Sequence, residues 1–108
     1  MKLSQIIKEL SLVEITPYEE DVVPSGVYAG DFLSRAMSHV KDGNLWITIM
    51  SNTNVIAVAS LSGASLIILA ESVELMQEAK EAAKKEGIGV FSSPLSVYEL
   101  CNELGKLL

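Results

Sequence analysis

The sequence predicts one α/β domain, 1–108, built on a mostly parallel sheet with helices on both faces. Three runs, 45–50, 66–70 and 90–91, are almost continuously apolar. Such runs, without polar alternation, are typical of strands buried on both faces of a parallel sheet. Helical segments separate the runs, and strands that alternate with helices form right-handed βαβ units. A length of 108 residues fits a single domain.

The N-terminal segments predict a short helix and two further strands. Apolar side chains at helical spacing predict a helix over 3–10. Alternation over 12–15 and the short apolar piece 27–29 predict strands. We expect these two strands to form a hairpin-like pair, which would add an antiparallel edge to the sheet. The segment 16–26 between them holds two prolines and a glycine, and is expected to be a loop.

The second predicted helix covers 32–41. The carboxylate of Asp31 is expected to cap it by accepting hydrogen bonds from amides of the first turn. Gly43 is expected to end it. Its buried face is expected to hold Leu33, Ala36, Met37 and Val40.

Three more helices complete the predicted alternation. The apolar segment 55–62, rich in small residues, lies between two predicted strands. Ser72 is expected to cap a long helix that ends near Gly87. Ser93-Pro94 is expected to open a last helix, with proline in the first turn, where its missing amide costs nothing.

The charge balance argues against nucleic acid as a partner. Eight basic residues stand against 14 acidic ones, for a net charge of −6, whereas phosphate neutralisation needs clustered cations. The only basic cluster is Lys80, Lys84 and Lys85, which has acidic neighbours on the same helix and is interpreted as a solvated face.

The composition favours a homo-oligomer, most simply a dimer. Apolar residues make up 49% of the chain and aromatic residues only 6%. Surplus apolar surface in a short chain usually ends in an oligomer interface. The sequence leaves open whether that interface uses the apolar helix 55–62 or an exposed sheet edge.

The expected location is the cytoplasm. The single cysteine, Cys101, cannot form an intrachain disulfide and fits a reducing compartment. Residues 1–13 carry charges inside a helical pattern, which is unlike a signal peptide. No run approaches the ~20 apolar residues that a membrane span needs, so no membrane association is expected.

A ligand site is expected at the carboxyl ends of the strands. Ligands of open α/β sheets bind beyond these ends, and the amides of a helix N-terminus can hold an anion there. Ser, Thr and Asn are also ordinary helix caps, but four consecutive polar residues at 51–54 exceed what one cap needs. The candidate ligand-binding residues are Thr48, Ser51, Asn52, Thr53, Asn54, Glu71, Ser72, Ser92 and Ser93.

The chain offers no constellation for catalysis, so we expect that it is not an enzyme. His39 is the sole histidine, and Cys101 shares the apolar stripe of the last helix. Trp46 lies inside a predicted strand and is expected to pack under a helix. The seven glycines form no phosphate-binding loop. No metal site and no cofactor are expected.

Three segments together resemble the DRTGG domain family. They are LWITIMSNTNVIAVA from Leu45, LIILAES from Leu66, and SSPLS from Ser92. The family is similar to the N-terminal domain of HPr kinase/phosphorylase and occurs in phosphotransacetylases and CBS-containing pyrophosphatases. The chain is most similar to its short, stand-alone bacterial members.

The resemblance is one of pattern, because the family's two signature motifs are not preserved. Its Asp-Arg pair would fall near Ser51 and Asn52, and its Thr-Gly-Gly at Ala70, Glu71 and Ser72. The resemblance implies a regulatory or oligomerising role. It implies no kinase activity, because the phosphate-binding loop of HPr kinase belongs to a separate domain.

These observations predict a non-catalytic regulatory module that binds a small ligand or a partner protein, acting as a homodimer. Two alternatives remain at this level. The chain would be a structural subunit of a larger complex, or a small enzyme that uses the polar side chains at the strand ends. General acid–base chemistry near neutral pH usually needs a positioned histidine or paired acids, which favours the regulatory module.

Overall fold

Five strands form one sheet in the computed structural model, which describes residues 1–108. The strands are β1 (Val13–Thr16), β2 (Gly26–Ala29), β3 (Asn44–Thr48), β4 (Leu66–Leu69) and β5 (Val90–Ser92). Their order is β1-β5-β4-β3-β2. The strands β2 to β5 run parallel, and β1 is antiparallel to β5. The predicted α/β class, the mostly parallel sheet and the antiparallel N-terminal edge strand are therefore confirmed.

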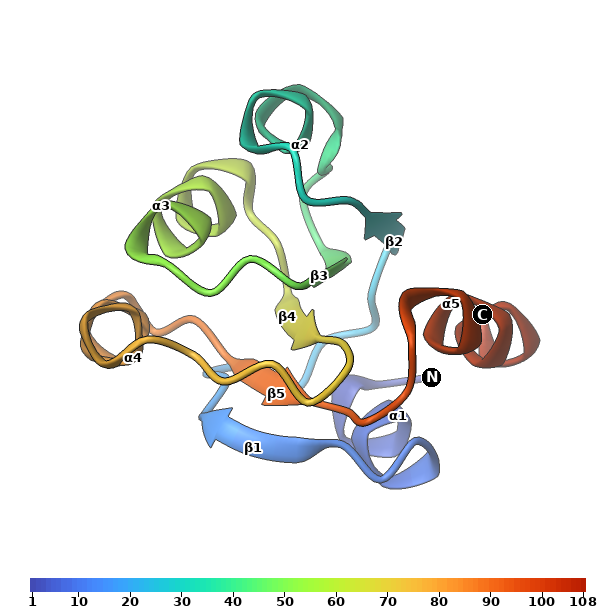
Figure 1. Cartoon of the computed structure of the whole chain (residues 1–108). Helices are drawn as coiled ribbons and strands as arrows, with labels where there is room; N and C mark the ends of the chain where they lie inside the picture. Colours follow the sequence, from blue (N-terminus) through green and yellow to red (C-terminus); the bar gives the residue numbers. More distant parts are fainter.

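The helices cover both faces of the sheet (Figure 1). They are α1 (Leu3–Glu9), α2 (Leu33–His39), α3 (Thr53–Ser62), α4 (Gln77–Glu86) and α5 (Val97–Leu107). Right-handed crossovers from β2 through β5 always step in the same direction, so α2, α3 and α4 lie on one face. The other face is covered by α1 and α5. None of the helices is both long and apolar enough to span a membrane.

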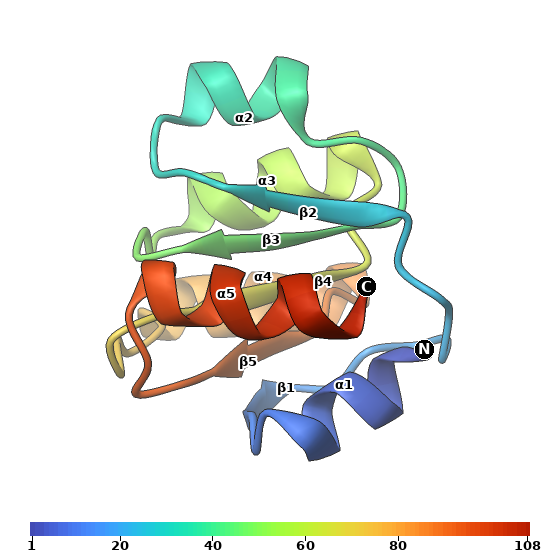
Figure 2. The ribbon, with the colours of Figure 1, turned by 90° about the vertical axis from the view of Figure 1, so that its right-hand side faces the viewer.

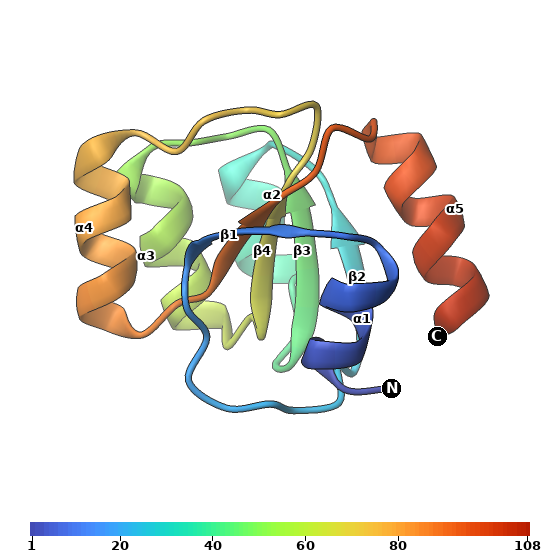
Figure 3. The same cartoon turned by 90° about the horizontal axis from the view of Figure 1, so that it is seen from below.

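The expected hairpin-like pair is wrong, because β1 and β2 lie at opposite edges of the sheet. The segment 17–25 that joins them runs along the amino ends of the parallel strands (Figure 3). A loop of this length, with Pro17 and Pro24, is too long for a tight hairpin turn. Once β2 is free of β1, it opens the first βαβ unit with α2 and β3.

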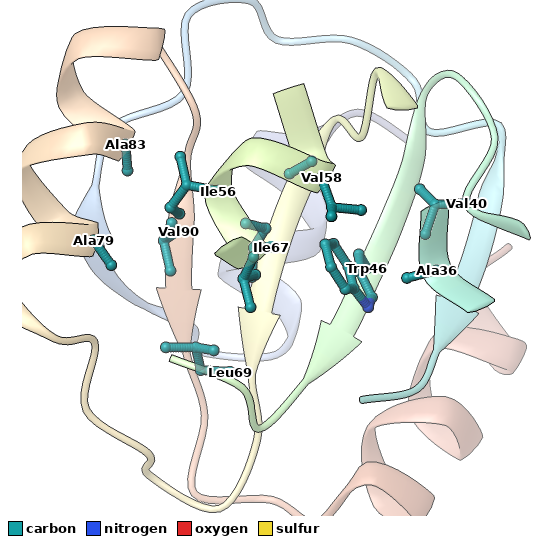
Figure 4. Close-up of a cluster of buried hydrophobic side chains, with 12 residues drawn as sticks. Ala36, Val40, Trp46, Ile56, Val58, Ile67, Leu69, Ala79, Ala83 and Val90 are labelled. Atoms are coloured by element: carbon teal, nitrogen blue, oxygen red, sulfur yellow. The ribbon is translucent and has the colours of Figure 1, made fainter. Parts of the chain in front are cut away.

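The larger core lies between the sheet and α2, α3 and α4 (Figure 4). Trp46 on β3 is fully buried there, and its Nε1–H donates to the carbonyl of Gly30 at 3.0 Å. This confirms that Trp46 packs under a helix. The second core lies on the other face, where Leu100 and Leu104 of α5 and Leu3 and Ile6 of α1 pack on the strands.

Helix α2 starts within one residue of its predicted start, but its predicted cap, Asp31, and its predicted end at Gly43 are wrong, since its C-cap is Val40. Its N-cap is Phe32, with no side-chain cap, because the carboxylate of Asp31 points instead to the end of β3. Asp31 Oδ1 accepts from Thr48 Oγ1 at 2.8 Å and from the Ile49 amide at 2.9 Å. Met37, expected on the buried face, is 51% exposed because it points toward the gap between α2 and α3.

Two later helices also begin after their predicted starts. Helix α4 begins at Gln77 and its N-cap is Met76, so Ser72 does not cap it. Helix α5 is capped by Ser96, whose hydroxyl accepts from the Glu99 amide at 3.1 Å. In both loops, backbone bonds between neighbouring strand ends hold the residues before the helix in other conformations.

Candidate functional site

The loops that follow β2, β3, β4 and β5 gather at the end of the sheet formed by the carboxyl ends of these strands, which we call the carboxyl rim (Figure 2). Backbone hydrogen bonds tie them together. The Met76 amide donates to the Ser51 carbonyl at 3.1 Å, which joins the loops after β3 and β4. The amides of Glu71 and Ser72 donate to the carbonyls of Leu95 and Ser93, both at 2.9 Å, which joins the loops after β4 and β5.

Three of the nine predicted site residues use side-chain oxygens in hydrogen bonds within the domain. Thr48 is fully buried and donates to Asp31. Asn52 caps α3 by accepting from the Asn54 amide at 3.0 Å. Ser93 is buried, and its hydroxyl accepts from the Leu95 amide at 3.1 Å. These side chains therefore stabilise the loops of the carboxyl rim, and their bonded oxygens are not free to bind a ligand.

The predicted cluster at 51–54 does not form one site. Ser51 is half-buried on the rim, and Thr53 and Asn54 are exposed on the first turn of α3. Asn54 lines a separate hollow of about 480 Å³ between α2 and α3, whose other walls are mainly apolar. The periodicity of α3 separates these side chains, because consecutive helical residues point in different directions.

Glu71 and Ser72 hold left-handed backbone conformations, with φ of 57° and 56°. This region favours glycine, because a Cβ crowds the following carbonyl. These two positions are where the resemblance places the family's Gly-Gly. The backbone of this loop thus has the shape that two glycines would adopt, although the side chains differ.

Two of the predicted residues, Ser72 and Ser92, line a common crevice of about 390 Å³ between β5, α4 and the loop that follows β4. Neither hydroxyl makes a hydrogen bond within the chain. The remaining walls are Ile15, Val73, Glu74, Leu75, Gln77 and Lys80. The crevice therefore combines a cation, two free hydroxyls, a carboxylate and an apolar floor.

Sequence reasoning missed Lys80, which it assigned to a solvated helix face. Lys80 is half-buried, one turn into α4, and forms no ion pair. It reaches the crevice because α4 begins at Gln77 and not at Ser72, which places its first turn beside Ser92. The only sequence signal is that Lys80 stands apart from the pair Lys84 and Lys85 by one helical turn.

The position of the crevice has a topological reason. The chain leaves β4 toward α4 on one face of the sheet, and leaves the adjacent β5 toward α5 on the other face. The crevice lies beside this divergence, on the α4 side, where Ser92 at the end of β5 and Ile15 of β1 face the loop that follows β4. Carboxyl ends of strands near such a divergence are where open α/β sheets bind ligands.

A larger hollow, of about 520 Å³, lies at the opposite end of the sheet, along the amino ends of the parallel strands. None of the predicted site residues lines it. Its charged residues are Glu19, Glu20 and Asp42, so it is acidic. No three His, Cys, Asp or Glu side chains in the chain are close enough together to hold a metal ion.

His39 and Cys101 have ordinary environments. His39 is exposed on α2, and its Nδ1 lies 2.9 Å from the Arg35 carbonyl. Cys101 is half-buried on α5 beside the second core. The Ser38 hydroxyl also lies 2.9 Å from His39 Nδ1, but both side chains are exposed on α2 and the hydroxyl also donates to the Arg35 carbonyl, so this is a local helix contact outside any pocket.

Comparison with known proteins identifies the fold. No family model and no curated protein matches the chain. A crystal structure of the CBS and DRTGG domains of the regulatory region of Clostridium perfringens pyrophosphatase, complexed with the activator diadenosine tetraphosphate, is similar with a TM-score of 0.78. The two are 22% identical, and the match covers 93% of this chain and 44% of that one. At this identity the similarity shows a shared fold, and this chain spans less than half of that regulatory region.

Proposed function

We propose that this chain is a non-catalytic regulatory module that binds a small anionic ligand in the crevice between β5 and α4. The observation that carries the proposal is that the free hydroxyls of Ser72 and Ser92 and the unpaired Lys80 line one crevice at the carboxyl ends of β4 and β5, beside the first turn of α4. Binding sites of open α/β sheets lie at such points.

The chemistry of the crevice suits a phosphate group with a hydroxylated body. Lys80 supplies a positive charge, and the N-terminus of α4 supplies amides that no side chain caps. Such amides carry a partial positive charge. Glu74 can accept hydrogen bonds from ligand hydroxyls. Nucleotides have this combination of groups.

The structural similarity supports a regulatory role. The similar region of the pyrophosphatase is regulatory and was crystallised with a nucleotide activator. The left-handed pair Glu71–Ser72, at the position of the family's Gly-Gly, supports a DRTGG-like domain. We extend the proposal to a homodimer in the bacterial cytoplasm, as the resemblance and the composition imply.

A thermal-shift screen with nucleotides and dinucleoside polyphosphates tests the proposal. At a tenfold excess over its dissociation constant, a ligand should raise the melting temperature by roughly 5–10 °C. Lys80→Gln should remove the shift. Lys84→Gln is the matched control, since Lys84 is exposed on the same helix but does not line the crevice. A shift that survives in Lys80→Gln would place the ligand elsewhere, and the absence of any shift would contradict the proposal.

The hollow between α2 and α3 favours a second candidate, a structural subunit of a larger complex. Leu33, Met37, Ala57 and Val58 line it, and exposed apolar hollows are typical of protein-binding surfaces. If the chain is such a subunit, Met37→Lys should weaken assembly with its partner, and the nucleotide screen should be negative.

A further inference from the structure

The outer edge of β2 is open. No strand pairs with it, and Figure 2 shows β2 from this side, between α2 above and α5 below. The Gly30 amide donates to the Ile47 carbonyl of β3 at 3.1 Å. Because alternate residues of a parallel strand bond to the same neighbour, the amides and carbonyls of Val27 and Ala29 point away from the sheet.

The other edge of the sheet is protected. On β1, Glu14 places an exposed charge, the ladder is irregular between Glu14 and Thr16, and Pro17 follows. Charges, bulges and prolines are the usual means of blocking edge-to-edge pairing. The sequence Gly-Val-Tyr-Ala of β2 has none of these.

Apolar surface continues outward from this open edge. A hollow of about 290 Å³ separates β2 from α5, and it is lined mainly by apolar side chains. Val27 is 37% exposed and Leu108, which follows α5, is 49% exposed. Half-buried Cys101 lines the same hollow. A strand edge with an apolar flank is a surface that a further strand would cover.

We propose that a second copy of this chain covers it, with β2 pairing antiparallel to β2 of the partner across a two-fold axis. The inference rests on the homodimer of the proposed function. It assigns the interface to the sheet edge and not to helix 55–62. That helix packs between α2 and α4, and its buried side chains are Val55, Ile56, Val58 and Ala59.

One register satisfies every outward backbone group. With the axis at Tyr28, Val27 lies opposite Ala29 of the partner subunit, and each such pair exchanges two hydrogen bonds. Tyr28 then lies opposite Tyr28 of the partner subunit, as a non-hydrogen-bonded pair with Cα atoms about 4.5 Å apart.

The charges beside β2 are complementary under this symmetry. Both α2 and α5 run antiparallel to β2 (Figure 2). An acid stands at the start of each helix, Asp31 before α2 and Glu99 in α5. A base stands at each end, Lys41 after α2 and Lys106 in α5. The two-fold axis therefore sets acidic helix starts beside basic helix ends, and it sets the helix dipoles antiparallel. Lys106 also pairs with Glu103 of its own helix at 3.4 Å on the surface, and Asp42 follows Lys41, so the charge pattern supports the two-fold arrangement less than the register of β2 does.

Cross-linking tests the register directly. In a Cys101→Ser background, Tyr28→Cys should form an intermolecular disulfide under mild oxidation, because the expected Cα separation suits one. Val13→Cys is the control on the protected edge. Val13 is 59% exposed, so its failure to cross-link would not reflect poor access to the thiol.

Sedimentation of the full chain supplies the second measurement. The wild type should be a dimer, Val27→Lys should raise the dimer dissociation constant at least about tenfold, and Val13→Lys should not. Circular dichroism checks that each variant folds, and if Tyr28→Cys does not fold, Val27→Lys decides.

The outcomes separate this inference from the proposed function. A dimer that survives Val27→Lys and does not cross-link at position 28 would overturn the β2 interface and leave the homodimer standing. A monomer at all concentrations would overturn both. The ligand screen on the same samples would still test the crevice.

Discussion

Glu71 and Ser72 are two consecutive residues that the fold holds in left-handed conformations; Ser11 is the one other non-glycine residue with positive φ. Each has positive φ, which costs a residue with a Cβ roughly 1–2 kcal/mol. The amides of the consecutive pair, bonded to Leu95 and Ser93, fix the conformation by joining two strand ends. The strain therefore sits beside the proposed crevice, where loop shape matters most.

Glycine at either position should stabilise the domain. Glu71→Gly and Ser72→Gly relieve the left-handed strain but add unfolded-state entropy, for a net gain of up to about 1 kcal/mol each. The melting temperature should rise by several degrees. Ser60→Gly, in the last turn of α3, is the control and should cost about 0.5 kcal/mol. If both glycine variants melt below the wild type, the left-handed assignment is wrong.

Asp21 should make stability depend on pH. The Ser4 hydroxyl and amide donate to its carboxylate at 2.6 and 2.8 Å, and these bonds hold the pKa of Asp21 below its ordinary value. A lowered folded-state pKa gives stability above the ordinary value of about 3.9, which is lost as the pH falls through the folded-state pKa.

Comparing melting temperatures of the wild type and Asp21→Asn at several pH values checks this expectation. The wild type should be more stable at pH 6, and the difference should shrink as the pH falls below about 4. Glu20→Gln removes the neighbouring charge without removing a hydrogen bond, so it should show no such trend. A difference that is the same at pH 6 and pH 2.5 would contradict the account.

At the scale of elements, the strands are predictable from sequence, whereas the N-caps of α2, α4 and α5 are not. The strands β3 and β4 can be recognised in the sequence as nearly continuous apolar runs, because all their residues are buried. Asp31, Ser72 and Ser93 all resemble caps. Their roles depend on bonds to residues on other strands, which local sequence does not specify.

Capping separates the two interpretations of these loops. Ser96→Ala removes the cap of α5 and should cost about 1 kcal/mol, which lowers the melting temperature by about 4–8 °C. Ser72→Ala should change it little, because its hydroxyl bonds to nothing in the chain. Equal losses in the two variants would restore Ser72 as a cap.

The candidate site was half predictable for the same reason. The rule that ligands bind at strand carboxyl ends led to Ser72 and Ser92, which line the proposed crevice. It also led to Thr48 and Ser93, which are buried. The sequence does not show which hydroxyls form hydrogen bonds inside the folded domain. Lys80 enters the crevice only through the late start of α4.

At the scale of the whole molecule, the two hollows at opposite ends of the sheet differ in charge. The charged residues of the hollow at the amino ends are all acidic, Glu19, Glu20 and Asp42, whereas the crevice at the carboxyl rim holds Lys80 together with Glu74. A chain with a net charge of −6 therefore repels an anion over most of its surface. We expect an anionic ligand to bind in the crevice at the carboxyl rim and not in the larger, wholly acidic hollow.

Amide chemical-shift mapping with a nucleotide that raises the melting temperature tests this central claim most directly. If the crevice is the site, the chemical-shift changes should concentrate at 72–80 and at Ser92, and Lys80→Gln should abolish them at the same ligand concentration. Shifts centred on Glu19 and Asp42, or on the hollow between α2 and α3, would contradict it.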